Sequence, residues 1–355
     1  MTRAAVLFGG PSDEHDISIL TGLQVAHALD DPAALYWSKA GEWFLVDPDS
    51  EAADFVEGVP RKARPVSFVA SSQGGFLVKR KPLDFDVAVI ACHGGPGEDG
   101  TLQGALDLAG IRYTGPGQAA SALGMDKFAF GAAMRTAGLP TLDRILVSPE
   151  SEPPFAGPYI VKPRFGGSSI GIEVVEDWPT AKALVERSPF MGSGGVAEPF
   201  VDGSRDLQLA VRTHPSLELS AIEEPARSGG IYGYDQKYLA WGGEVSAGRK
   251  LPADLDGVLE ERLRGLARQV AEVTGVRGIA RIDFLERDGE VWVNEINTIP
   301  GSMAAYLWID PPRSRAELFA DLVAEAAAGP ARVFSTAGSD GAALRNAGAI
   351  ESKLG

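Results

Sequence analysis

Short apolar runs alternate along the chain with segments in which apolar residues recur every three or four positions. The runs at residues 4–10 and 85–95 each end in two glycines, as buried strands that lead into tight turns do. Helices are predicted to follow at residues 17–29 and 99–110, where the apolar spacing is helical. Such strand–glycine–helix units predict a parallel sheet with ligand-binding loops at the carboxyl ends of its strands.

The pattern changes after the turn signal TGPGQ at residues 114–118. A helix is predicted at residues 125–140, stopped by Gly138 and Pro140. Residues 159–175 and 194–212 each predict a strand, a loop and a strand.

Residues 234–251 lack clear periodicity and predict a long loop, which in a compact domain is usually functional. An amphipathic helix is predicted at residues 253–276. We therefore expect four parts: an N-terminal α/β domain, a central domain, a C-terminal domain, and a small, polar, poorly ordered tail, at residues 1–118, 119–194, 195–329 and 330–355.

Residues 281–297 (RIDFLERDGEVWVNEIN) predict a β-hairpin around Asp288-Gly289. A two-residue loop would place Asp283 and Glu295 on opposite faces, because side chains alternate along a strand. We predict instead a three-residue loop, residues 287–289, with Gly289 in the left-handed conformation. That register gathers four polar side chains on one face: Arg281, Asp283, Glu295 and Asn297. It sends four others to the core: Ile282, Phe284, Trp292 and Ile296.

The polar face of this hairpin has two interpretations. It is either a solvated face with an arginine–carboxylate pair, or a set of hard oxygen ligands for Mg²⁺ that bridges substrate phosphates. The second interpretation requires a nucleotide site elsewhere in the chain.

Composition excludes several classes of partner. The formal net charge of −15 argues against nucleic acid or an anionic membrane as the main partner. The single cysteine, Cys92, lies in an apolar run and is expected to be a buried, unreactive thiol in a reducing compartment. No run of 18 apolar residues and no signal peptide is found, so a cytoplasmic location is expected.

A glycine- and serine-rich loop follows a predicted strand at residues 161–171 (VKPRFGGSSIG). Backbone N–H groups of small residues, with the hydroxyls of Ser168 and Ser169, can hold a phosphate, and Lys162 would supply charge. The alternative is a flexible hairpin turn. Neither a Walker A motif nor a complete dinucleotide fingerprint occurs, so a nucleotide would not bind by those routes.

Other candidate residues carry weaker signals. Lys127 begins a predicted helix, where a lone lysine usually faces solvent. Asp99 is expected to cap the helix after it. The remaining candidates follow strands or lie in the long loop: Glu14, His93, Glu198, the backbone of Phe200 and Val201, Asp206, Lys237 and Tyr238.

Taken in order, these segments closely resemble the D-alanine–D-alanine ligase family of ATP-grasp enzymes. The resemblance covers residues 3–325 and rests on GGPSDEHDIS, HGGPGEDG, MDK, VKPRFGGSSIG, YDQKY, RIDF and NEINTIPG. It implies an α/β ATP-grasp fold in which an N-terminal parallel α/β domain precedes two α+β subdomains that clasp ATP. It further implies two Mg²⁺ ions, with Mn²⁺ as an alternative, amino-acid substrates and a homodimer.

The resemblance also implies a reaction. ATP phosphorylates the carboxylate of one D-amino acid, and the amine of a second attacks the acyl phosphate to give an amide. Glu14 would hold the first substrate's ammonium, and His93 would lie beside the substrates. Lys127 and Lys162 would bind the ATP phosphates, and Ser168 would belong to the loop that covers them. Glu198 would meet the adenine amine, Asp206 the ribose, and Lys237 and Tyr238 would belong to a closing loop. Asp283, Glu295 and Asn297 would bind the metals, and Arg281 with the N–H of Gly301 the oxyanion.

Three departures from the family pattern bear on the substrates. Tyr306 occupies the position of a serine that usually binds the second substrate's carboxylate, with Ser302 as the nearby hydroxyl. Asp206 matches the ribose-binding glutamate only after one insertion, and the closing loop contains Trp241 and two glycines. Tyr238 is retained, which in the family goes with an amine nucleophile.

These features leave three hypotheses. The first is a D-alanine–D-alanine ligase of cell-wall synthesis. The second is a family ligase with a different amino-acid donor or acceptor, in specialised metabolism. The third is a nucleotide-binding module without catalysis, which would predict the loss of metal ligands or of Arg281.

Overall fold

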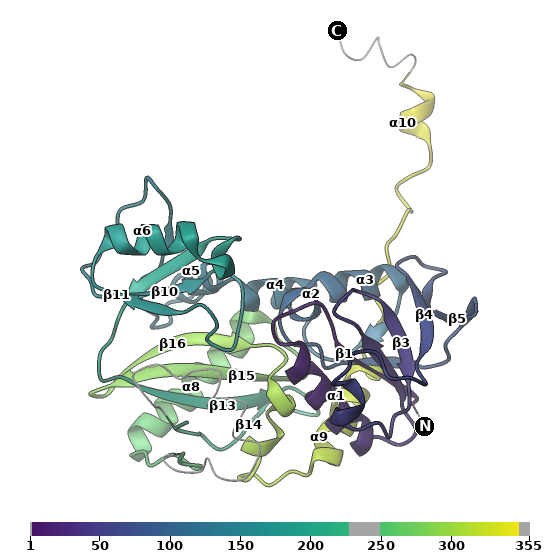
Figure 1. The fold of residues 1–355 in the computed structure, drawn as a ribbon, viewed down its shortest axis with the longest axis horizontal. Helices are drawn as coiled ribbons and strands as arrows, with labels where there is room; N and C mark the ends of the chain where they lie inside the picture. The colour runs from purple at the N-terminus through teal and green to yellow at the C-terminus, as the bar shows by residue number, and fades with distance from the viewer. Residues whose placement is uncertain (1, 227–248, 348–355) are drawn as a thin grey trace.

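The computed structural model describes residues 2–226 and 249–347, and within them three β-sheets organise the chain (Figure 1). Their strands fall in three successive parts of the sequence. The described residues contain no helix that is long and apolar enough to cross a membrane.

The first sheet has the strand order β6-β5-β4-β3-β2-β1-β7-β8. Its strands are β1 (Ala4–Gly9), β2 (Ala33–Trp37), β3 (Trp43–Val46), β4 (Arg64–Val69), β5 (Gly75–Val78), β6 (Lys81–Pro82), β7 (Val87–Ile90) and β8 (Arg112–Tyr113). Only β2, β1, β7 and β8 pair in parallel, and the others pair antiparallel. The expected parallel sheet is thus present, with an antiparallel extension from residues for which no strand was predicted.

Helices cover this sheet and carry the loops at its carboxyl edge. They are α1 (His15–Ala28), the 3₁₀ turn η1 (Ala52–Phe55), α2 (Gly95–Glu98), α3 (Thr101–Ala109) and, from the far end of the sequence, α9 (Arg315–Ala328). Leu318 and Phe319 of α9 share the core of this sheet with Leu7 and Val89. The last helix before the tail therefore packs on the N-terminal part, and the expected domain of residues 195–329 does not hold together as one unit.

The second sheet has the order β11-β10-β12-β9. Its elements are β9 (Ile145–Val147), β10 (Tyr159–Pro163), β11 (Glu173–Val175) and β12 (Gly195–Pro199), with α6 (Trp178–Arg187) and the 3₁₀ turn η2 (Pro189–Met191). Because β12 pairs with β10 and β9, the central sheet extends to Pro199. The expected boundary after residue 194 is therefore about five residues too early.

The third sheet is antiparallel, with the order β14-β13-β15-β16. Its elements are β13 (Arg205–Arg212), β14 (Glu218–Leu219), β15 (Ile279–Arg287) and β16 (Glu290–Asn297), with α8 (Gly257–Thr274) on one face. Phe130 and Met134 of α5 (Lys127–Thr136) share its core with Phe284 and Leu263. The 3₁₀ segment η4 (Gly301–Leu307) follows β16, and α4 (Gln118–Met125) contacts β16.

The helix predicted at residues 125–140 is the shorter α5, and Asp126 separates it from α4, which ends at Met125. The Asp126 side chain accepts hydrogen bonds from the N–H groups of Phe128 and Ala129, which begins α5 at Lys127. Asp99 accepts a hydrogen bond from the Thr101 N–H at the start of α3, but the N-cap residue is Gly100, so Asp99 lies one position before the expected cap. The loop prediction for residues 234–251 falls mostly outside the described residues.

The β15–β16 hairpin has a two-residue loop, Asp288-Gly289, so the predicted three-residue loop is wrong. Both loop residues have positive φ, +52° and +83°, as a type I′ turn requires. The predicted polar face nevertheless forms, because a β-bulge at Asn294 shifts the register between Asp283 and Phe284. Asp283 then pairs with Glu295, and Arg281 with Asn297.

The core face of this hairpin also differs from the prediction. Ile282, Phe284 and Ile296 are buried as expected, but Trp292 is not in the core and its neighbours Val291 and Val293 are. Trp292 pairs with Leu285, which a two-residue loop places on the other face. The described part of the tail leaves the body of the molecule and contains the short helix α10 (Ala342–Arg345) (Figure 1).

Candidate functional site

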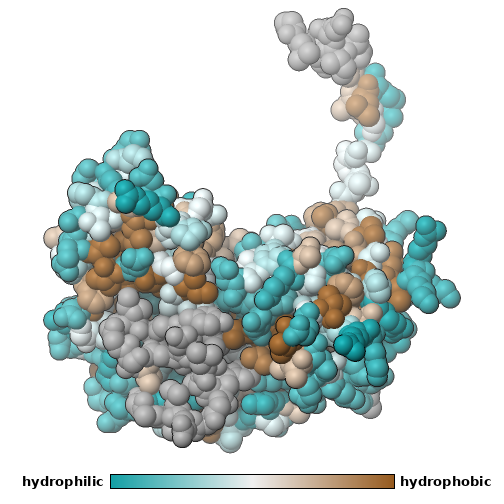
Figure 2. Space-filling model, viewed as in Figure 1, coloured by the Kyte–Doolittle hydropathy of each residue, from teal (hydrophilic) through white to brown (hydrophobic). Residues whose placement is uncertain are grey.

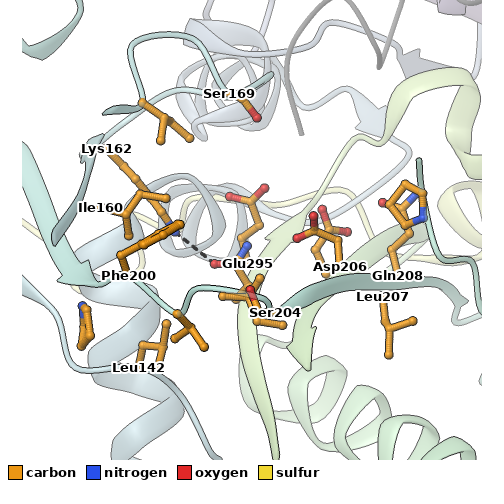
Figure 3. A pocket seen from close by; sticks show the side chains of 17 residues that line it. Leu142, Ile160, Lys162, Ser169, Phe200, Ser204, Asp206, Leu207, Gln208 and Glu295 are labelled. Carbon is orange, nitrogen blue, oxygen red and sulfur yellow. Dashed lines mark hydrogen bonds between the residues drawn. The ribbon is translucent and has the colours of Figure 1, made fainter. Parts of the chain in front are cut away.

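A cavity lies between the central and C-terminal sheets. Lys162 and Ile160 reach it from β10, Phe200 from the end of β12, and Asp206 and Glu295 from the third sheet (Figure 3). Val201, Asp283 and Ser169 also line it. Figure 2 shows hydrophobic surface on the lobe that carries α6, on its side toward the C-terminal sheet. An apolar slot with a few convergent charges is the form that nucleotide sites take.

Lys162 is held at the floor of this cavity by two acceptors. Its Nζ donates to Glu198 Oε2 at 2.8 Å and to Asn294 Oδ1 at 3.2 Å. Glu198 is fully buried, and its Oε1 lies 2.9 Å from the Nε of Arg144. Burial by itself would raise the pKa of Glu198, but Lys162 and Arg144 outweigh it and hold that pKa below its ordinary value. The carboxylate is therefore ionised and shared between two cations.

Both oxygens of the Glu198 carboxylate thus already have partners, Arg144 and Lys162, although this carboxylate was expected to contact the adenine amine. Glu198 is absent from the residues that line the cavity in the described part of the chain, whereas Phe200 and Val201 are present. The backbone of those two residues remains the predicted adenine reader, and contact between Glu198 and adenine stays a prediction.

Lys127 is buried at the first turn of α5, contrary to the solvent-facing position expected of a lone helical lysine. Its Nζ donates to the carbonyl of Gly166 at 2.6 Å and lies 3.7 Å from Glu295 Oε2. Burial lowers the pKa of Lys127, and the negative charge of Glu295 partly opposes this. Lys127 thereby connects the glycine-rich loop to the carboxylates of the hairpin.

The glycine–serine loop folds toward Glu14. Ser168 and Ser169 both have positive φ, +53° and +57°, a conformation that non-glycine residues seldom adopt. The hydroxyl of Ser168 donates to Glu14 Oε1. A Cβ on Gly167 would lie 2.7 Å from Glu14 Oε2, so a side chain there would displace the Glu14 carboxylate. The first and second parts of the chain therefore meet at Glu14.

The polar face of the hairpin concentrates charge. Arg281 makes a bidentate pair with Asp283, with Nε–Oδ1 and Nη2–Oδ2 distances of 2.7 Å, and Asn297 donates to Asp283 Oδ2 at 3.1 Å. Among the described residues, no group of three or more histidine, cysteine, aspartate or glutamate side chains could hold a metal. The candidate donor set here is two carboxylates and an amide, whose hard oxygens fit Mg²⁺.

A second, smaller cavity adjoins the first. It is lined by predicted residues from distant parts of the sequence: Glu14, His93, Lys127, Arg281, Glu295, Asn297 and Gly301. Glu295 lines both cavities. A group that reached from one cavity to the other would pass this carboxylate.

His93 uses both ring nitrogens to hold the segment after β16. Its Nδ1–H donates to the carbonyl of Ile299 at 2.6 Å, because a carbonyl can only accept. Its Nε2 lies 2.8 Å from Thr21 Oγ1, and Thr21 in turn accepts from the Ser302 N–H at 3.1 Å. Burial lowers the pKa of His93, so the imidazole is neutral and accepts at Nε2. His93 lies beside the cavity as expected, and its hydrogen bonds hold the backbone around Gly301.

Glu98 is a site residue that the sequence reasoning missed. Its carboxylate accepts from the N–H groups of Gly94 and Ile299, both at 2.9 Å, and it lines the second cavity. Burial, reinforced by the negative charge of Glu14, raises the pKa of Glu98 to about 7. Its place in HGGPGEDG, just after a strand, was a signal for it, but only His93 and Asp99 of that segment were interpreted. Asn294 begins NEINTIPG and was also missed, and Arg144 was missed because no motif contains it.

The two acceptor-site candidates lie in η4. Ser302, Met303 and Ala304 have consecutive positive φ values near +50°, a strained backbone directly after Gly301, which lines the second cavity. Gln208 Nε2 lies 3.4 Å from the Tyr306 hydroxyl, and the Arg249 guanidinium lies 4.9 Å from the Tyr306 ring centroid. In the described part of the chain, neither Ser302 nor Tyr306 lines the two cavities. Lys237 and Tyr238 lie outside the described residues.

Comparisons with known proteins identify the family of the chain. Two family models match: "D-ala D-ala ligase N-terminus" over residues 3–116 and "D-ala D-ala ligase C-terminus" over residues 141–324. A D-alanine–D-alanine ligase from Methylobacterium sp. (strain 4-46) is 35% identical, with 94% of each chain covered. Another, from Campylobacter lari, is 34% identical, with 86% of this chain and 89% of the relative covered.

Solved structures give the same result for the fold. The VanG D-Ala:D-Ser ligase from Enterococcus faecalis superposes with a TM-score of 0.78 at 25% identity, over 92% of this chain and 99% of that one. The D-alanine–D-alanine ligase from Coxiella burnetii gives 0.76 at 23% identity, over 92% and 95% of the two chains. The chain belongs to the D-alanine–D-alanine ligase family and has its ATP-grasp fold.

Proposed function

We propose that this protein is an ATP-dependent ligase that joins two D-alanine molecules, with release of ADP and phosphate. The observation that carries the proposal is Glu295, which lines both the cavity between the sheets and the cavity that holds Glu14 and Arg281. ATP in the first cavity would direct its terminal phosphate toward an amino-acid carboxylate in the second. Phosphoryl transfer between them needs such a junction, because its catalysis rests on positioning and electrostatics.

The first cavity supplies the groups for ATP. Phe200 and Val201 offer backbone and apolar contacts for adenine, and Asp206 offers a carboxylate for the ribose. The phosphates would meet Lys162 and Ser169 in this cavity, Ser168 in the same loop, and Lys127, which lines the second cavity. Negative charge collects on the phosphoryl oxygens during transfer, so cations fixed at these positions lower the barrier.

Asp283, Glu295 and Asn297 fit two Mg²⁺ ions or Mn²⁺, because Asp283 and Glu295 are paired across the ladder and Asn297 contacts Asp283. Bound there, the ions would bridge and neutralise the phosphates. Arg281 already neutralises part of the charge of Asp283. Cation binding at Asp283 therefore requires the Arg281 guanidinium to turn toward the substrate.

The second cavity supplies the groups for the amino acids. Glu14 carries a buried carboxylate, oriented by Ser168, that suits the ammonium of the first D-alanine. Arg281 and the Gly301 N–H are donors for the oxyanion that forms when the second amine attacks the acyl phosphate. His93 and Glu98 hold the Gly94 and 298–302 segments in place around them. Collapse of the tetrahedral intermediate expels phosphate and leaves the amide.

A second candidate keeps the reaction and changes the acceptor. The position of Tyr306, in contact with Gln208 and Arg249, differs from the serine of the family pattern. The solved VanG enzyme, a D-Ala:D-Ser ligase, is a family relative whose acceptor is not D-alanine. An acceptor pocket rebuilt around Tyr306 would select another amino acid.

The test is phosphate release from ATP and Mg²⁺ across single D- and L-amino acids and their pairs, with mass spectrometry of the products. Release with D-alanine alone, yielding the D-Ala-D-Ala dipeptide, is expected. Turnover only with D-alanine and a different partner would favour the second candidate. No turnover with any amino acid, despite nucleotide binding, would reject both and revive a binding module without catalysis.

A further inference from the structure

Arg144 is a buried arginine to which the roles above assign nothing. It directly precedes β9, and only 4% of its side chain is exposed. Its guanidinium lies under the junction of the two sheets, 5.9 Å from the centroid of the Phe130 ring. Burial of an arginine is costly unless its charge is paired and its donors find acceptors.

The guanidinium reaches three separate segments. Its Nη1 donates to the carbonyl of Lys127 at the start of α5, and its Nη2 donates to the carbonyl of Asn294 in the bulge of β16. Its Nε lies 2.9 Å from Glu198 Oε1 of β12, a contact that is ionic without hydrogen-bond geometry. The same group thereby connects the two sheets that form the walls of the first cavity.

Each segment that Arg144 holds also positions one of the two lysines that bind phosphates in the proposed function: Lys162, which lines the first cavity, or Lys127, which lines the second. The carbonyl it binds belongs to Lys127 itself, and Asn294 and Glu198 are the two acceptors of Lys162 Nζ. The Arg144 side chain packs tightly against α5, because a Cβ on Gly131 would lie 2.5 Å from Arg144 Cδ. A shift of Arg144 would therefore move both lysines.

Charge balance points the same way. Glu198 paired with Lys162 alone would form a neutral pair, and the ammonium would offer little net charge to a ligand. With Arg144 on the other oxygen, the buried cluster of Arg144, Glu198 and Lys162 carries a net charge of +1 beside the cavity. In a low-dielectric interior that difference acts strongly on a polyphosphate.

We propose that Arg144 is a positioning residue for nucleotide binding: it fixes the backbone of Lys127 and Asn294, and it shares Glu198 so that Lys162 keeps charge for the phosphates. This rests on the proposed function, in which those two lysines bind ATP. It requires no contact between Arg144 and the nucleotide.

The test is the dissociation constant of ADP with Mg²⁺, measured by calorimetry without amino acids, for Arg144→Met. We expect ADP binding to weaken by about tenfold or more, and Arg144→Lys to recover part of the loss. The KM for ATP should rise in parallel while the KM for the amino acid stays within about twofold. Arg135→Met is the matched control, because Arg135 lies on α5 in a half-exposed pair with Asp143 and should bind ADP as wild type does.

Loss of Arg144 leaves Glu198 partly unpaired and can prevent folding. The second comparison is therefore Glu198→Gln against Glu198→Gln/Arg144→Met, in which no half-paired buried carboxylate remains. The double variant should still bind ADP about threefold or more weakly than Glu198→Gln, because the donors to Lys127 and Asn294 are gone. Unchanged ADP affinity in folded Arg144→Met, or in this pair, with only a lower Tm, would make Arg144 merely structural and overturn the proposal.

Failure here can be told apart from failure of the proposed function. Lys162→Met and Lys127→Met test the assignment of the lysines directly. If neither weakens ADP binding, the proposed nucleotide site is wrong. If both do and the Arg144 variants do not, only the positioning role of Arg144 fails.

Discussion

Arg281 makes two hydrogen bonds to Asp283 and also faces the cavity that holds Glu14 and Gly301. In the proposed reaction Arg281 would serve two partners in turn, a carboxylate at rest and the developing oxyanion. Arg281 lies on β15 rather than on a loop, and Asp283 of the same strand holds its guanidinium. Preorganised donors of this kind are the largest single contribution in many acyl-transfer enzymes.

Replacing Arg281 with alanine should therefore leave the fold intact and lower kcat by at least about tenfold, toward 10²-fold. The measurement is phosphate release at saturating substrates, with circular dichroism to confirm folding. Arg287→Ala on the same strand is the control, since Arg287 is exposed at the turn and pairs only with Asp288 among the described residues. Near-wild-type turnover of Arg281→Ala would reject the oxyanion role.

His93 gives the pH dependence of stability a defined sign. Its folded-state pKa is lowered below the ordinary 6.5 by burial, so the unfolded chain binds the proton first as pH falls. The stability it contributes is complete above pH 6.5 and is lost as pH falls toward the folded pKa. Glu98, with its pKa raised to about 7, acts in the opposite sense, since its contribution is complete below 4.5 and is lost as pH rises through 7.

The free energy of unfolding of His93→Gln should consequently fall less than that of wild type between pH 7.5 and pH 5.5. Glu98 is present in both proteins, so its opposite contribution cancels in the comparison. Urea titrations at several pH values measure the difference. Parallel pH curves for the two proteins would mean that His93 is not held neutral by the fold.

At the scale of elements, one extra residue in β16 and one helix cap on α5 determine where the side chains of the site lie. The bulge at Asn294 shifts the register of the hairpin by one residue and brings Asp283 opposite Glu295. It also turns the side chain of Asn294 toward Lys162 and its carbonyl toward Arg144. Bulges beside active sites commonly redirect side chains in this way. The Asp126 cap starts α5 at Lys127, so that this lysine faces the cavity.

Asp126→Ala should destabilise the protein by about 1–2 kcal/mol, from loss of the cap and of the part-buried pair with Arg164. Asp126→Asn keeps a capping oxygen and should recover most of the cap's share, about 1 kcal/mol. Denaturant unfolding measures both variants. Equal losses for alanine and asparagine would show that the ion pair, rather than the cap, stabilises this junction.

At the scale of the molecule, the chain returns to its beginning after the third sheet. Helix α9 packs into the core of the first sheet, and Arg277 binds the carbonyls of Gly115 and Tyr113 across the same junction. The first cavity lies between the second and third sheets, and Glu14 and His93 from the first part of the chain line the second cavity. A homodimer stays a prediction of the family resemblance.

This architecture predicts different effects at the two ends of α9. Phe319→Ala, which removes a fully buried ring, should lower the free energy of unfolding by about 3–5 kcal/mol. Removing residues 330–355 should cost less than about 1 kcal/mol and leave turnover unchanged, because the described tail is tied to the body chiefly by the half-exposed Arg332–Asp107 pair. Thermal melts and phosphate release test both, and a loss of activity on truncation would give the tail a functional role.

Much of the site could be predicted because its functional side chains lie in short sequence motifs. Apolar periodicity gave the main strands and helices, and the order of motifs identified the candidate residues, since each motif keeps its polar groups at the end of one strand. Arg144 could not be predicted in this way, because its partners lie on other elements and no motif contains it. Glu98 and Asn294 lie inside quoted motifs, but their roles depend on contacts with other elements.

The sequence by itself determined the family, the kinds of side chain available for catalysis and the strands that carry them. Only the tertiary structure decided the hairpin register, the burial of Lys127, the sharing of Glu198 and the return of α9 to the first sheet. The physical reason is that side-chain periodicity is local, whereas a bulge, a buried charge pair and a packed helix are stabilised by contacts between distant segments.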